Sequence, residues 1–212
     1  MTIDEALAAG APPVVAILRG IETHEAEAVA GALVDAGIRL IEVPFNSPDP
    51  DGAIAAMAAA LGSRAAIGGG TVTSPALAER LAAAGGRFMV SPNVDPSVIA
   101  RSLALGMDVL PGFLTPTEAF AAIGAGARRL KLFPGAALGS GHVSALRDVL
   151  PREVEIWAVG GVGPANVAEF RAAGVTGIGV GGSLYRPGDG PDAVGQRAAA
   201  LVAAWHAASQ AH

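Results

Sequence analysis

Short apolar runs recur along the chain at nearly regular intervals, and each run has the length and composition of a buried β-strand. The start-to-start spacing is about 20 to 26 residues, the length of a strand, a helix and two short loops. The runs comprise residues 14–19, 40–45, 65–72, 88–92, 108–113, 129–134, 155–161 and 177–183. The pattern therefore predicts eight strand–helix units.

The segments between the runs are rich in alanine and have helical periodicity. Several begin at a capping residue or a glycine followed by proline: Ser74-Pro75, Asp95-Pro96, Thr115-Pro116 and Gly163-Pro164. A helix that begins near Thr23 is expected to stop at Gly37.

Apolar strands that alternate with helices predict a parallel sheet covered by helices. Eight repeats favour an α/β fold of the (β/α)8 TIM barrel type, formed by residues 1–212 as a single domain. A doubly wound open sheet is the alternative, although a strand–GxGxxG–helix unit followed by an acidic residue is absent from the sequence.

Composition and charge exclude several functions. The net charge is −5, and no basic cluster is longer than Arg128-Arg129, so we expect no nucleic-acid partner. The chain has no cysteine, which excludes disulfides and thiolate chemistry. It has no apolar run of about 18 residues and no signal-peptide pattern at its start, so we expect a cytoplasmic protein without a membrane partner.

The four histidines do not form an HxH or HExxH motif, and we expect neither a metal site nor a cofactor. His24 begins a predicted helix, His142 is expected in a glycine-rich loop, and His206 and His212 are expected in a C-terminal helix or at its end.

Lys131 is the single lysine of a chain that contains thirteen arginines. Strand alternation predicts that Leu130 and Leu132 face the helices while Lys131 points into the barrel. Burial would lower the pKa of its amine, and such a lysine can form a Schiff base with a carbonyl substrate, which arginine cannot. A lysine that snorkels or pairs with a carboxylate is the alternative.

Polar residues that fall late in other runs are further candidates, because barrel active sites lie at the carboxyl ends of the strands. Glu42 interrupts an apolar strand and suits proton transfer, or else forms a buried ion pair. Arg19 suits a substrate carboxylate, or else a salt bridge at the rim. Thr71 adds a hydroxyl. The glycine-rich ends of the last two runs suit a phosphate; they contain Gly160, Gly161, Gly181, Gly182 and Ser183.

Taken together, these motifs resemble the 2-keto-3-deoxy-6-phosphogluconate and -galactonate aldolases, which are Schiff-base enzymes on a (β/α)8 barrel. The resemblance covers nearly the whole chain, and the Lys-x-Phe-Pro motif at Lys131 combined with Glu42 is its specific part. Other matching segments are Ala16–Gly20, Ile41–Pro44, Gly70–Val72, Ser91–Asn93, Ala158–Val162 and Gly181–Tyr185.

The resemblance implies that Lys131 forms the Schiff base and that Glu42 is the general acid and base. It also implies that Arg19 and Thr71 contact the carboxylate end of a phosphorylated sugar acid or of pyruvate, and that the two glycine-rich ends bind phosphate. The implied reaction is reversible cleavage to pyruvate and glyceraldehyde 3-phosphate, without a metal, in a homotrimer.

Two positions separate the branches of this family. The gluconate type carries an arginine and a threonine where this chain has Asn46 and Val159, as in the galactonate type. These residues favour the galactonate epimer. Phe45 and the order Gly181-Gly182-Ser183 depart from the galactonate pattern.

Other functions stay open at this point. The nearest rivals are a gluconate-type and a dual-specificity aldolase. A phosphosugar-binding barrel without catalysis is a different class, and so is an isomerase that uses Glu42 as its base.

Overall fold

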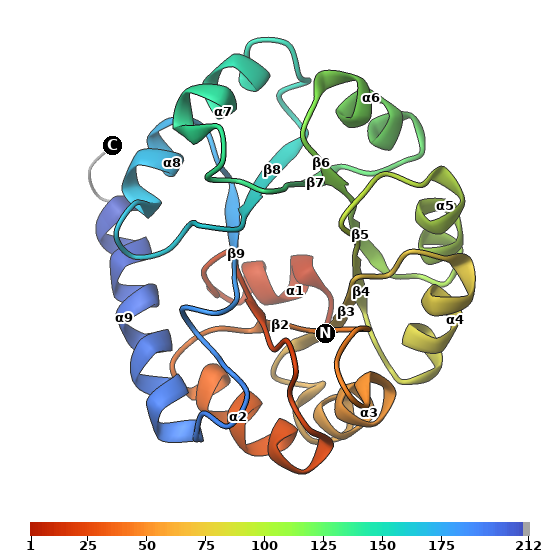
Figure 1. Cartoon of the computed structure of the whole chain (residues 1–212), viewed down its shortest axis with the longest axis vertical. Coiled ribbons are helices and arrows are strands. Elements are labelled where there is room, and N and C mark those ends of the chain that lie inside the picture. Colours follow the sequence, from red (N-terminus) through yellow and green to blue (C-terminus); the bar gives the residue numbers. More distant parts are fainter. Residues whose placement is uncertain (210–212) are drawn as a thin grey trace.

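The computed structural model describes residues 1–209 as a parallel sheet of nine strands surrounded by helices (Figure 1). The strands are β1 Val14–Ile17, β2 Leu40–Pro44, β3 Ala66–Gly70, β4 Phe88–Val90, β5 Asp108–Leu110, β6 Gly112–Phe113, β7 Arg129–Leu132, β8 Glu155–Val159 and β9 Gly177–Val180. Their order in the sheet is β5-β4-β3-β2-β1-β9-β8-β7-β6. The predicted α/β fold with a parallel sheet is confirmed.

The predicted run at 108–113 forms two short strands rather than one. β5 pairs with β4, and β6 pairs with β7. Pro111 separates them, and proline has no N–H with which to continue a ladder. Its carbonyl nevertheless accepts a hydrogen bond from the Lys131 N–H at 2.9 Å. The chain thus passes from one edge strand of the sheet to the other within one residue, and the sheet closes into a nearly complete barrel.

The helices are α1 Ile3–Ala8, α2 Thr23–Asp35, α3 Pro50–Leu61, α4 Pro75–Ala83, α5 Pro96–Ala104, α6 Pro116–Gly124, α7 Gly139–Arg147, α8 Val167–Ala172 and α9 Pro191–Ser209. Helices α2 to α8 connect strands and, together with α9, cover the outside of the barrel, whereas α1 precedes β1 and lies inside the ring of helices (Figure 1). The predicted caps Ser74, Asp95 and Thr115 each accept a backbone N–H with their side chains. Gly37 follows α2 with a φ of 101°, as its predicted stop requires.

Two further local predictions were wrong. The helix expected at Gly163-Pro164 begins only at Val167, because the Asn166 side chain holds the preceding residues in a turn. His142 lies in α7 rather than in a loop, and its Nε2 contacts the Leu114 carbonyl oxygen at 2.9 Å. His212 lies outside the described residues.

Buried apolar side chains form two separate cores. The larger core lies between strands and helices and includes Leu130 and Leu132. The smaller core fills the barrel and includes Phe88 and Trp157 together with Ile3 of α1. Helix α1 was not predicted, and it closes the amino-terminal end of the barrel. The opposite end is left open for a pocket.

Within the described residues, no helix combines the length and the apolar character that crossing a membrane requires.

Candidate active site

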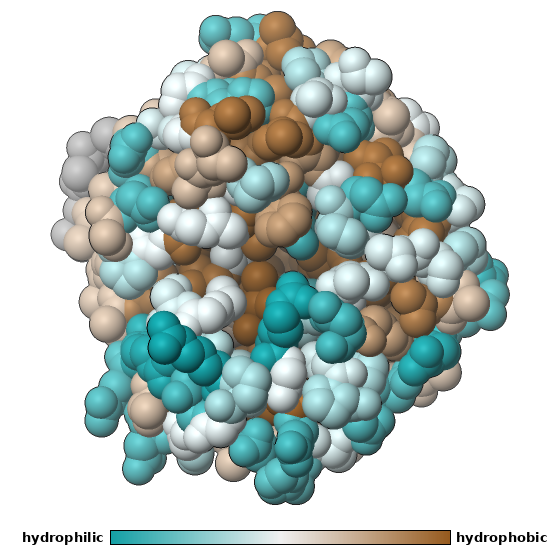
Figure 2. Space-filling view, in the orientation of Figure 1, coloured by the Kyte–Doolittle hydropathy of each residue, from teal (hydrophilic) through white to brown (hydrophobic). Residues whose placement is uncertain are grey.

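A pocket of about 670 Å³ opens at the carboxyl ends of the strands. Figure 2 shows a depression near the centre of this face, with apolar residues inside and hydrophilic residues along part of its rim. Of the predicted site residues, all but Asn46 line the pocket: Arg19, Glu42, Thr71, Lys131, Val159, Gly160, Gly161, Gly181, Gly182 and Ser183. The fold therefore brings residues from six strand ends to one place.

Lys131 lies on β7 and points into the barrel, as strand alternation predicted, while Leu130 and Leu132 pack in the outer core. Only 7% of its surface is exposed. Burial lowers the pKa of its amine; the Glu42 carboxylate opposes this shift, and the Arg19 guanidinium adds to it. Because burial lowers the pKa, a larger fraction of the amine is neutral, which is the nucleophilic form. Nζ also lies over the Phe133 ring, 4.7 Å from its centroid, and this contact favours the protonated amine.

Glu42 lies on β2 and is 2% exposed. Burial raises the pKa of its carboxyl to about 7, although Lys131 and then Arg19 act in the opposite direction. A group with such a pKa can both accept and donate a proton near neutral pH. Its Oε2 is buried and has no hydrogen-bond partner among the described residues, a cost that falls on the charged form of the carboxyl.

Gly70 makes room for this carboxylate. A Cβ built on Gly70 would lie 1.7 Å from Oε2 of Glu42. The neighbouring strand β3 therefore has a glycine at the position where any side chain would displace the acid.

Neither Glu42 nor Lys131 forms an ion pair within 4.0 Å in residues 1–209. The structure thus does not show the salt-bridged alternatives for these two residues. Both groups line one pocket, and neither is neutralised by a direct ion pair.

Arg19 and Thr71 lie at the same mouth. The exposed Arg19 donates through Nη1 to Oδ1 of Asn46 at 2.6 Å, so its partner is an amide rather than the carboxylate of a rim salt bridge. This hydrogen bond restricts the orientation of the Arg19 guanidinium. Thr71 has a φ of 57°, which is uncommon for a β-branched residue and marks local strain at the pocket.

The loops after β8 and β9 supply the glycine-rich side of the pocket. Gly160 and Gly161 have φ values of 94° and 78°, which turn the backbone in a way that favours glycine. The Gly181 carbonyl accepts N–H groups of Leu184 and Tyr185, so the second loop folds into a tight turn. Backbone turns of this kind present N–H groups to anions.

The pocket residues that were not predicted as site residues include four with aromatic, amide or guanidinium side chains: Phe133, Asn166, Tyr185 and Arg186. Phe133 belongs to the Lys-x-Phe-Pro motif, which could have identified it. The other three lie beyond the strand ends, where no strand alternation assigns a direction to a side chain. In the part of the chain that the structure describes, no group of three His, Asp or Glu residues is arranged to hold a metal ion.

The fold and the pocket together define a class of protein: an α/β barrel with a buried lysine and a buried carboxylic acid in a pocket at the carboxyl ends of its strands, a combination suited to Schiff-base chemistry. A family model for KDPG and KHG aldolase matches residues 3–191. This chain belongs to the KDPG and KHG aldolase family, and it is an aldolase, a carbon–carbon lyase.

Individual relatives agree with this assignment. A probable 2-dehydro-3-deoxy-6-phosphogalactonate aldolase of Rhizobium meliloti is 49% identical over 92% of each chain. The 2-dehydro-3-deoxy-6-phosphogalactonate aldolase of Escherichia coli is 46% identical over 93% of this chain and 97% of its own. A 2-dehydro-3-deoxy-phosphogluconate aldolase of Treponema pallidum is 34% identical over 76% and 74% of the two chains. A solved structure described as native KDPGal has a TM-score of 0.92 and 45% identity, with coverage of 93% and 96%.

Proposed function

We propose that this protein cleaves 2-dehydro-3-deoxy-6-phosphogalactonate reversibly to pyruvate and glyceraldehyde 3-phosphate through a Schiff base on Lys131. The observation that carries the proposal is the pocket itself, in which one buried lysine and one buried acid face a cavity large enough for a six-carbon phosphosugar acid.

In the first steps, the neutral amine of Lys131 adds to the C2 ketone, and loss of water gives a protonated imine. Glu42 moves the protons that this addition and dehydration require. Because the protonated imine accepts the electron pair of the C3–C4 bond, no metal or cofactor is needed.

In the cleavage step, removal of the C4 hydroxyl proton breaks the C3–C4 bond and releases the aldehyde. The electron pair passes into an enamine of pyruvate. A proton added at C3 restores the imine, and water then hydrolyses it to pyruvate and the free lysine. The raised pKa of Glu42 suits it to take up and return these protons.

The two ends of the substrate require different groups. Arg19 and Thr71 would hold the carboxylate, and Gly160, Gly161, Gly181, Gly182 and Ser183 would hold the phosphate. Asn46 and Val159 would set the preference at C4. Asn46 supports this role through its bond to Arg19, and Val159 through its position in the pocket wall.

Further parts of the proposal concern the whole molecule. We interpret 108–113 as one strand position of an eightfold (β/α)8 barrel, and residues 1–212 as one domain. We also propose that the chain forms a homotrimer. A structural neighbour described as a cage designed by fusing symmetric oligomeric domains, with a TM-score of 0.93 and 44% identity, supports an oligomer. The cytoplasmic location stays a prediction.

The decisive test is trapping with pyruvate and borohydride. Because Lys131 is the single lysine, a reduced pyruvyl adduct on a lysine can be only at this residue, and peptide mass spectrometry separates it from modification of the N-terminal amine. Lys131→Arg should retain the fold and lose both the adduct and cleavage. If folded wild-type protein forms no adduct, the aldolase mechanism is excluded, and the remaining hypotheses are the non-catalytic phosphosugar-binding barrel and the isomerase.

Cleavage rates of the two C4 epimers test the substrate. We expect a higher kcat/KM for the galactonate epimer. A clear preference for the gluconate epimer would instead assign the chain to the gluconate type.

A further inference from the structure

Arg186 is an exposed arginine on the wall of the pocket, in the segment that follows β9. Its Nε donates to the carbonyl oxygen of Gly182 at 3.0 Å. Gly182 belongs to the glycine-rich turn that also contains Gly181 and Ser183. The guanidinium therefore lies against the loop that would hold the phosphate.

The backbone around Arg186 is held in place from two sides. Its N–H donates to Oδ2 of Asp189 at 2.8 Å, and the same oxygen pairs with Nη2 of Arg197 at 2.8 Å. Pro187 packs against Gly20, where a Cβ would come within 2.8 Å of the proline ring. The segment is thus fixed beside the loop that follows Arg19, at the rim of the same pocket.

This anchoring leaves the end of the guanidinium free for a ligand. One donor, Nε, is used by Gly182, while Asp189 is occupied by a backbone N–H and by Arg197. No carboxylate lies within 4.0 Å of the Arg186 side chain in residues 1–209. A planar fork with unused donors matches the oxygens of a phosphate.

The charges that line the pocket fit this assignment. Among the described residues that line the pocket, Arg19, Lys131 and Arg186 are basic and Glu42 is the single acid, although the whole chain has a net charge of −5. Arg19 lies at the end assigned to the carboxylate, and Arg186 lies beside the turn assigned to the phosphate. Each anionic end of the proposed substrate thus meets one guanidinium.

We propose that Arg186 binds the phosphate group of the substrate through its guanidinium and thereby selects phosphorylated aldehydes over their unphosphorylated counterparts. This inference rests on the proposed aldolase function, because that function supplies the phosphate. It assigns a side-chain cation to an end of the pocket that otherwise offers backbone N–H groups and one serine hydroxyl.

The test compares two aldehydes that differ only in the phosphate. In the direction of synthesis, with pyruvate in excess, Arg186→Ala should lower kcat/KM for glyceraldehyde 3-phosphate about tenfold or more, mainly through KM. The same variant should change kcat/KM for glyceraldehyde less than about twofold. Arg186→Lys keeps the charge but loses the planar fork, so its kcat/KM for glyceraldehyde 3-phosphate should lie between those of Arg186→Ala and the wild type.

Three further measurements isolate the phosphate contact. Inorganic phosphate should inhibit the wild-type enzyme competitively against glyceraldehyde 3-phosphate and should inhibit Arg186→Ala several-fold more weakly. Arg152→Ala removes one exposed positive charge that does not line the pocket, and it should leave all these values unchanged. Trapping by pyruvate should be equal in all variants, since pyruvate carries no phosphate.

Equal losses with both aldehydes, or no loss with glyceraldehyde 3-phosphate, would overturn the role of Arg186. If Arg186→Ala does not fold, Arg186→Met keeps the aliphatic stem and must show the same selective loss. Failure of the proposed function is distinguishable, because the wild-type protein would then not be trapped by pyruvate.

Discussion

Glu42 illustrates how one buried acid links catalysis to stability. Burial raises its pKa from 4.5 to about 7 in the folded chain. Between these two values the unfolded chain has released the proton while the folded chain retains it. The free energy of unfolding therefore falls as the pH rises from about 4.5 to about 7, and the loss is complete above that range.

The variant Glu42→Gln should lack this pH dependence. Relative to the variant, the wild-type protein should lose on the order of 2 kcal/mol of stability between pH 5 and pH 8. Urea unfolding at both pH values measures the difference. Glu153→Gln, which alters an exposed carboxylate, should follow the wild type. Parallel stability curves for the wild type and Glu42→Gln would contradict the raised pKa.

Gly70 permits a second prediction at the scale of single atoms. Gly70→Ala would place a methyl group on the Glu42 carboxylate, and we expect kcat to fall about tenfold or more because the acid must move. Gly31→Ala is the matched control: Gly31 lies in α2, and a Cβ there meets nothing within 4 Å apart from the backbone of that helix. That control should keep full activity and gain about 0.5 to 1 kcal/mol of stability. Full activity in Gly70→Ala would argue against the position assigned to the acid.

At the scale of elements, periodicity located the strands well because each is buried on both faces. The predicted runs at Val14, Leu40, Phe88, Asp108, Arg129, Glu155 and Gly177 all begin where strands begin. The split at Pro111 escaped prediction because it depends on which neighbouring strand each half of the run pairs with. The late start of α8 escaped because it depends on two side-chain hydrogen bonds of Asn166, which an apolar pattern does not reveal. Helix α1 escaped because six residues are too few to establish a helical period.

The candidate site also contains residues that the sequence pattern could predict and residues that it could not. Lys131 and Glu42 were predictable because each is a charged residue inside an apolar strand, where alternation assigns its direction. Asn166 and Arg186 lie outside the strands, where no alternating pattern assigns a direction to a side chain. Sequence patterns therefore found the residues proposed for bond cleavage more readily than those proposed to hold the phosphate.

The loop after β8 is held by one side chain, which makes its role testable. Asn166 accepts the Gly163 N–H and donates to the Gly161 carbonyl, both at 2.9 Å. Asn166→Ala should release the turn and raise KM for glyceraldehyde 3-phosphate several-fold, with a smaller change in kcat. Asn166→Asp keeps the first bond but opposes the second, so a comparable rise is expected. An unchanged KM in both variants would show that the turn holds without this residue.

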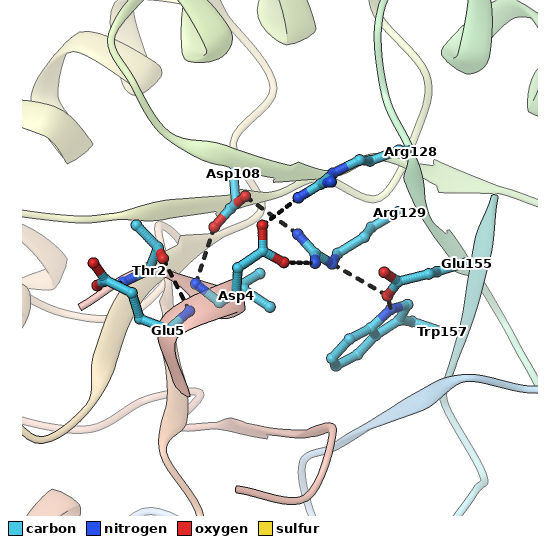
Figure 3. Close-up of polar contacts among 9 residues, drawn as sticks. Thr2, Asp4, Glu5, Asp108, Arg128, Arg129, Glu155 and Trp157 are labelled. Carbon is cyan, nitrogen blue, oxygen red and sulfur yellow. Dashed lines mark hydrogen bonds and ion pairs between the residues drawn. The ribbon is translucent and has the colours of Figure 1, made fainter. Parts of the chain in front are cut away.

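At the scale of the whole molecule, the two ends of the barrel differ in how their charged side chains are paired. Where the strands end, Glu42 and Lys131 are buried without an ion-pair partner in residues 1–209. At the end where the strands begin, the charged side chains pair closely (Figure 3). There Arg129, 3% exposed, contacts Asp108 at 3.2 Å and Glu155 at 3.1 Å, and it also pairs with Asp4 of α1. Asp108 in turn accepts the Ile3 N–H at 3.0 Å. These contacts attach α1 to the strands and close the barrel opposite the pocket.

The adjacent Arg128 and Arg129 allow the contribution of these contacts to the free energy of unfolding to be measured, because both contact Asp4 but only Arg129 is buried. Arg129→Met leaves Asp108 and Glu155 without their cation and should reduce the free energy of unfolding by about 3 to 5 kcal/mol. Arg128→Met breaks an exposed pair, 62% and 55% accessible, and should cost at most about 1 kcal/mol. Denaturant unfolding measures both changes.

Pyruvate trapping at 25 °C should be equal per folded molecule in the two variants, since the cluster lies at the end of the barrel opposite Lys131. Similar stability losses in both variants would mean that α1 is held by its apolar contacts, such as Ile3, rather than by the buried guanidinium.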